Sequence, residues 1–162
     1  MKNVGKRLSA LGVGALLAAS GAFIAVHEGY VPGDYVDPVG IQTACFGHTA
    51  TVNGANVSRT DEECLELLAD DLASHNRELL SAVKIELSRK EHMAYLSFHY
   101  NLGAHNFNRS TLLRKLNAGH RYEACKELSR WIYAGGQKLP GLVNRRSKER
   151  ELCLEGVTGH AD

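Results

Sequence analysis

The chain of 162 residues is long enough for one domain with a hydrophobic core, and its formal net charge of +1 gives no overall attraction to nucleic acid. Charge is unevenly distributed: residues 60–91 hold nine acidic and four basic side chains, and residues 109–150 hold three acidic and eleven basic ones. A basic region suits a polyanionic partner, but a solvated helix face with ordinary ion pairs explains the same pattern. We therefore expect no nucleic-acid partner.

The N-terminal segment has the composition of an export signal. Residues 1–7 carry three basic side chains and no acidic one, and residues 8–26 are uncharged over nineteen positions. As one helix, at ~1.5 Å per residue, these nineteen would extend about 28 Å, close to the ~30 Å hydrocarbon core of a bilayer. Eleven of the nineteen are Gly, Ala or Ser, so lipid would hold the segment weakly. It could be a signal peptide cleaved after Ala22, a permanent anchor, or an uncleaved signal that is later released; the weak apolarity disfavours the permanent anchor.

A small hairpin subdomain is expected next. Pro32-Gly33-Asp34 is a turn signal, and residues 39–47 show the alternation typical of a strand.

Helices dominate the rest of the chain. Thr60 and Ser88 each begin a capping box, which predicts helices from about residue 60 and from about residue 88, the second ending near Gly103. Shorter helices are expected near residues 110–117 and 120–132, and a last one from Pro140 to Leu154, ending before Gly156. The first helix should bury one face, formed by Leu65, Leu68, Leu72, Leu79, Leu80 and Val83. The predicted fold class is α+β, with a cleft between the hairpin subdomain and a mainly helical lobe.

Four cysteines allow three disulfide pairings. The sequence contains no close C-x-x-C pair of the kind that binds zinc. Export favours disulfides over free thiols. Cys45 ends the hairpin and Cys64 lies in the first turn of the next helix, so we expect these two to pair. Cys125 and Cys153 lie on two helices joined by a turn, and we expect the second disulfide between them.

Two carboxylates are placed for acid–base chemistry. Glycoside hydrolysis needs one protonated and one ionised carboxyl group. Apolar neighbours suit Glu28 to the protonated role, and a polar turn suits Asp37 to the ionised one. A hydroxyl at Thr43 could hold the attacking water. Taken alone, Glu28 and Asp37 could equally be two exposed loop carboxylates.

The spacing Glu28-x8-Asp37-x5-Thr43, followed by Cys-Phe-Gly-His-Thr, resembles the phage lysozymes of glycoside hydrolase family 24. Residues 98–119 and 130–153 resemble the lambdoid-phage endolysin branch, and the whole resemblance covers about residues 25–155. It implies a lysozyme-like fold and hydrolysis, without a cofactor or metal, of the β-1,4 bond between N-acetylmuramic acid and N-acetylglucosamine in peptidoglycan. Glu28 would be the general acid, Asp37 the base that positions water, and Thr43 its helper, mostly with inversion.

The resemblance also implies how the enzyme reaches its substrate. In this branch some endolysins carry a signal-anchor-release segment, which residues 1–26 resemble, leaving 27–162 as the catalytic domain. We therefore expect retention of the segment, insertion of residues 8–26 in the host inner membrane facing the periplasm, and later release to the periplasm as a monomer.

Other residues of the motifs have structural as well as functional interpretations. His48 resembles a structural histidine, with Asp71 as its expected partner and Asp70 as second choice. Asn101 could contact substrate or cap a helix. Arg145 could contact substrate or form ion pairs. Trp131, at helical spacing, is expected in the core.

Three rival functions remain. A zinc-dependent amidase is disfavoured because His27-Glu28 is not part of an H-E-x-x-H motif. A lytic transglycosylase needs a single Glu, so Asp37 and Thr43 argue against it. A holin-like membrane protein would not need a polar domain of this length.

Overall fold

The computed structural model describes residues 1–37, 40–49, 51–52 and 57–159, and Val39 of the predicted strand lies outside them. The chain forms two units, Met1–Ser74 and His75–Asp162. The boundary between them falls inside one long helix, α3 (Asp61–Ala82).

The apolar N-terminal segment forms two packed helices rather than one, α1 (Val4–Ala10) and α2 (Ala15–Glu28). The chain turns between them at Gly12, where φ is +83°. Gly21 on α2 allows close packing, because a Cβ there would lie 2.5 Å from a methyl carbon of Leu8 and 2.8 Å from one of Leu72. Among the residues described, no helix has the length and apolarity needed to cross a membrane.

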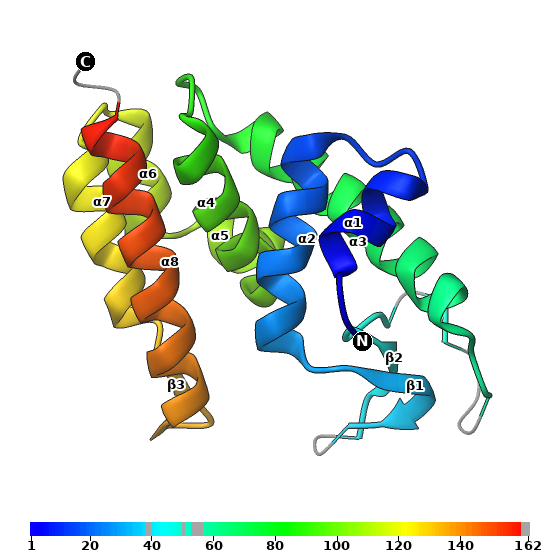
Figure 1. Ribbon diagram of the computed structural model, residues 1–162. Helices are drawn as coiled ribbons and strands as arrows, with labels where there is room; N and C mark the ends of the chain where they lie inside the picture. The colour runs from blue at the N-terminus through cyan, green and yellow to red at the C-terminus, as the bar shows by residue number, and fades with distance from the viewer. Residues whose placement is uncertain (38–39, 50, 53–56, 160–162) are drawn as a thin grey trace. The chain divides into compact units, whose positions relative to one another are not determined.

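The hairpin of the first unit consists of β1 (Val31–Val36) and β2 (Gln42–Cys45), which pair antiparallel (Figure 1). The turn predicted at Pro32-Gly33-Asp34 is wrong, because these residues lie within β1, where the register shifts. Gly33 has a φ of +123°, and the next amide, Asp34 N–H, donates to the carbonyl of Val57 at 2.8 Å. The Asp34 N–H therefore bonds to a segment distant in the sequence and not within a local turn.

The capping boxes at both predicted helix starts are present. Thr60 and Glu63 exchange side-chain-to-backbone hydrogen bonds at the start of α3, and Ser88 and Glu91 do so at the start of α4 (Arg89–Leu102). On α3 the expected apolar positions are buried except Leu80, which is half exposed, and Val83, which follows the helix and is partly buried.

The second unit is built around α4, and Figure 1 shows α8 running alongside it. Its core includes Tyr95, Phe98, Phe107, Leu112 and Leu128. The remaining elements are α5 (Ala104–Asn108), α6 (Thr111–Asn117), α7 (Arg121–Glu127), the 3-10 helix η1 (Leu128–Arg130), β3 (Tyr133–Ala134), β4 (Gln137–Lys138) and α8 (Pro140–Thr158).

The last helix and the loop before it differ from expectation. The last helix does not stop before Gly156, because α8 continues through it to Thr158. A Cβ on Gly156 would lie 2.5 Å from Ser88 Oγ and 2.7 Å from Glu91 N. This glycine serves close packing rather than helix termination. Gly135 and Gly136, with φ of +56° and +77°, connect β3 to β4 as a two-residue hairpin loop that was not expected.

Candidate active site

Glu28 is the last residue of α2, and Gly29, with φ of +74°, takes the chain out of the helix. The Glu28 side chain is half-buried. The loop that follows β2 approaches it closely, since a Cβ on Gly47 would lie 3.3 Å from Glu28 Oε2. The helix end and the hairpin of the first unit therefore meet at this carboxylate.

Asp37 follows β1 and is held by the backbone of Ile41. Its Oδ1 accepts the Ile41 N–H at 2.8 Å, and its own N–H donates to the Ile41 carbonyl at 2.9 Å. Thr43 on β2 is buried, and its hydroxyl donates to the same Ile41 carbonyl at 3.1 Å. The backbone of Ile41 therefore holds both the Asp37 carboxylate and the Thr43 hydroxyl.

Tyr35 links the two carboxylates electrostatically. Burial raises the pKa of its phenol, and the negative charges of Asp37 and Glu28 raise that pKa further. Tyr35 lies opposite Thr43 in the hairpin. Glu28, Asp37 and Thr43 thus share one neighbourhood within the first unit.

No motif in the sequence points to Tyr35. A signal was available: residues two apart on a strand lie on one face, and Tyr35 precedes Asp37 by two.

His48 and the first disulfide fasten the hairpin to α3. His48 is buried, and its Nδ1 lies 2.9 Å from both carboxylate oxygens of Asp71, while Nε2 lies 2.8 Å from the Thr51 hydroxyl. The Cys45–Cys64 disulfide joins β2 to the first turn of α3. The partner of His48 in the structure is therefore Asp71, the first choice from the sequence, rather than Asp70.

The second disulfide, Cys125–Cys153, joins α7 to α8. Both cysteine pairs in the structure are therefore those expected from the sequence.

Arg145, one of the two residues expected to contact substrate, lies in the interior of the second unit with only 4% of its surface exposed. Its Nε donates to Glu149 at 3.0 Å, and a terminal nitrogen donates to the Ser97 carbonyl at 3.0 Å. The structure therefore favours the ion-pair alternative for Arg145 over substrate contact.

Asn101, the other residue expected to contact substrate, accepts a hydrogen bond from Arg146, which also pairs with Glu149 and donates to the Trp131 carbonyl. Asn101 is exposed but is held by this interior network. Trp131 is only partly buried, and its ring meets Phe98 edge-on at 5.7 Å.

In the described part of the chain, one group of side chains has the donor set of a metal site: His75, Glu78 and His99, in the second unit. The H-E-x-x-H pattern, which the sequence lacks, does not include these residues. The i, i+3 spacing of His75 and Glu78 on a helix is the signal that could have found two of these residues.

The chain matches the phage lysozyme family over residues 25–149. It is 44% identical over 127 residues to a SAR-endolysin of Enterobacteria phage P21, an alignment that covers 78% of this chain and 76% of the relative. It is similar to the crystal structure of a P22 lysozyme mutant, with a TM-score of 0.74 and 31% identity over 84% of this chain and 95% of that one. The active form of the P1 phage endolysin Lyz has the same fold, with a TM-score of 0.78 and 21% identity over 93% of this chain and 90% of that one.

The family match includes the candidate site and parts of both units. The chain therefore belongs to the phage lysozyme family.

Proposed function

We propose that the chain is an inverting muramidase of glycoside hydrolase family 24, which cuts the β-1,4 bond between N-acetylmuramic acid and N-acetylglucosamine during lysis of a host cell. Glu28 is the general acid, Asp37 the general base, and Thr43 a positioning hydroxyl. The observation that carries the proposal is the approach of the hairpin to the end of α2: a Cβ on Gly47, in the loop after β2, would lie 3.3 Å from Glu28 Oε2, and the same hairpin holds Asp37 and Thr43 through Ile41. Membership of the phage lysozyme family supports the substrate class.

In this mechanism the two carboxyl groups act from opposite sides of the sugar ring. Glu28 protonates the leaving glycosidic oxygen, and Asp37 accepts a proton from the attacking water. The bond from Ile41 N–H fixes Asp37, and the bond to Ile41 O fixes Thr43, so the water site is set before substrate arrives. Room for that water requires about 6.5–9.5 Å between the two carboxyl groups.

Product analysis tests the reaction class. Purified protein should release fragments of peptidoglycan that end in reducing N-acetylmuramic acid, with the α-anomer formed first. An anhydro-sugar end would instead indicate a lytic transglycosylase. Release of stem peptides with intact glycan strands would indicate an amidase, and either result would overturn the proposal.

The proposal includes a membrane-held form that precedes the active one. Residues 8–26 carry no charge and are long enough to cross the inner membrane as one helix. The catalytic domain that follows them would then lie on the periplasmic side. In the folded structure the same residues are divided between α1 and α2, and Leu8 and Ile24 are buried. Release would thus exchange weak lipid contacts for protein contacts, and it would bring Glu28 to the hairpin in a monomeric enzyme.

Leucine substitutions at exposed positions separate these two forms. Ser9, Ala10 and Ala15 are exposed in the folded structure, so replacing all three with Leu should strengthen lipid binding without disturbing the fold. Gly21 is unsuitable for this test because it packs against Leu8 and Leu72.

On expression in a Gram-negative host, the triple-Leu variant should accumulate in the membrane fraction and lyse the culture late. A matched variant with Gln at the three positions should not accumulate there. Lysis of the triple-Leu culture on the wild-type schedule would contradict the membrane-held form, as would an intact mass showing that the wild-type protein begins after Ala22.

A further inference from the structure

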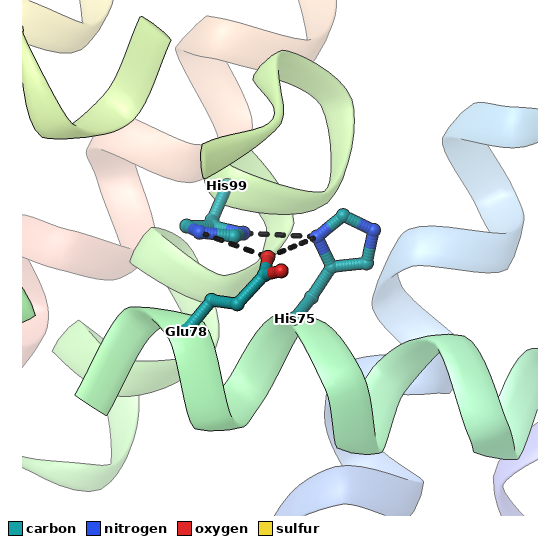
Figure 2. Close-up of side chains that lie close together, drawn as sticks. All are labelled: His75, Glu78 and His99. Carbon is teal, nitrogen blue, oxygen red and sulfur yellow. Dashed lines mark hydrogen bonds and ion pairs between the residues drawn. The ribbon is translucent and has the colours of Figure 1, made fainter. Parts of the chain in front are cut away.

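Three possible metal ligands, none of them a residue of the candidate active site, converge in the second unit. His75 and Glu78 lie one turn apart on α3, and His99 reaches them from α4 (Figure 2). Nδ1 of His75 lies 2.9 Å from Nδ1 of His99 and 3.9 Å from a carboxylate oxygen of Glu78. Nε2 of His99 lies 3.7 Å from that carboxylate. One ligand atom from each residue lies within 4.8 Å of the other two.

His99 gives an independent indication of a missing ligand. Its side chain is fully buried, and its Nε2 has no hydrogen-bond partner among the described residues. A buried polar atom without a partner is costly and uncommon in folded proteins. The rings of Phe107 and His75 lie 5.1 Å from the His99 ring, and Phe107 offers Nε2 no conventional acceptor. The open polar side of His99 faces Glu78 instead, as Figure 2 shows.

We propose that His75, Glu78 and His99 bind a zinc-class divalent cation, with water in a fourth position. Bonds of about 2.0–2.1 Å place tetrahedral ligand atoms about 3.3–3.4 Å apart. With Nε2 of His99 as its ligand atom, the Glu78 carboxylate oxygen lies 3.7 Å from His99 and 3.9 Å from Nδ1 of His75, both a little longer than that value, and all three ligand atoms lie within 4.8 Å of one another. Small side-chain rotations therefore suffice. Two imidazoles and one carboxylate form a donor set that suits Zn²⁺ better than Mg²⁺ or Ca²⁺.

The cation would fasten α3 to α4 inside the second unit. Glu78 and His75 are partly exposed, with 49% and 26% of their side chains accessible, so the ion has a route from solvent. Because the ligand set forms only when α3 and α4 pack together, binding would favour the folded state. The same side chains without a cation would form a His75–His99 hydrogen bond beside Glu78, and this is the alternative that the experiment must separate.

The test uses the purified full chain after treatment with a chelator, with ZnCl₂ as the probe. Calorimetric titration should show one saturable site, and the unfolding midpoint should rise with ZnCl₂ concentration. Co²⁺ should give the intense visible absorption of a tetrahedral site. Glu78→Gln and His75→Gln each remove one ligand at a partly exposed position, so both variants should fold, and each should bind Zn²⁺ at least about tenfold more weakly.

His105→Gln and His120→Gln are the matched controls, because both histidines are exposed and lie outside the cluster. They should bind Zn²⁺ as the wild type does. The proposal is overturned if the wild type shows no saturable site, or if Glu78→Gln and His75→Gln keep the wild-type affinity. Such a result would identify the cluster as a hydrogen-bonded histidine pair.

Discussion

Two carboxylates of the first unit contrast with two of the second. In the first unit Glu28 and Asp37 are half-buried at a helix end and a strand end. In the second unit Glu91 and Glu149 have no exposed surface, and both pair with arginines. Arginine pairs satisfy charge in the interior, whereas a carboxylate that must exchange protons with substrate needs an accessible position. Accessibility therefore separates the two proposed catalytic carboxylates from the two buried in arginine pairs.

The strongest test of the structural half of this comparison is Glu149→Gln. Glu149 pairs with both Arg145 and Arg146, so its removal leaves two buried guanidinium groups without their shared counter-charge. We expect a loss of about 3–5 kcal/mol in the free energy of unfolding, measured by urea denaturation. Glu151→Gln, at an exposed pair with Lys148 on the same helix, should cost less than about 1 kcal/mol. Equal losses in the two variants would remove the distinction.

A smaller effect is expected from Gly156→Ala. The new methyl group would lie 2.5 Å from Ser88 Oγ and 2.7 Å from Glu91 N, so α8 and the start of α4 would have to separate. We expect a loss of about 1–3 kcal/mol in thermal or chemical unfolding. Gly141 lies on the same helix with nothing within 4 Å of its built Cβ, so Gly141→Ala should be neutral or stabilising by up to about 1 kcal/mol. If both substitutions stabilised the protein, the close contact at Gly156 would be refuted.

The smallest effect concerns Glu127 on α7. The hydrogen bond from Lys115, followed by that from Arg130, lowers the pKa of Glu127. A carboxyl pKa that is lower in the folded state adds stability above the unfolded-state pKa of about 4.3, and this contribution is lost as pH falls below that value. Glu127→Gln should therefore cost about 1 kcal/mol at pH 7 and much less near pH 3.

Glu123→Gln, on the same helix at an exposed position, is the control for that pH dependence. Its unfolding free energy should differ little from wild type at either pH. A deficit for Glu127→Gln that did not shrink with falling pH would show that its ion pairs contribute nothing.

Local signals predicted the fold well where they act on their own residues. The capping boxes at Thr60 and Ser88 mark helix starts, because the bonds they predict are local. The predictions at Gly33 and Gly156 are wrong, because each glycine serves contact with a distant segment rather than a turn or a helix end. A sequence shows that a glycine is present, but the neighbour that requires it becomes known only from the packing.

The candidate site and the metal-ligand cluster also combine features that local sequence predicts with features that depend on packing. The spacing of Glu28, Asp37 and Thr43 carried the family resemblance, and the roles of these three residues stay predictions. The burial of Arg145 could not be predicted, because its partners Ser97 and Glu149 depend on how α4 and α8 pack. The convergence of His99 with His75 and Glu78 also depends on two helices meeting, so one spacing along one helix could suggest only part of it.

The central claim is that Glu28 and Asp37 perform the chemistry, and Glu28→Gln tests it most directly. The amide cannot donate the required proton, so clearance of permeabilised Gram-negative cells should fall by about 10²-fold or more, while the unfolding midpoint should change little because the side chain is only half-buried. Asp37→Asn should be severely impaired in the same turbidity assay, and Glu62→Gln, an exposed acid at the start of α3, should clear cells normally. Wild-type clearance by Glu28→Gln would contradict the account.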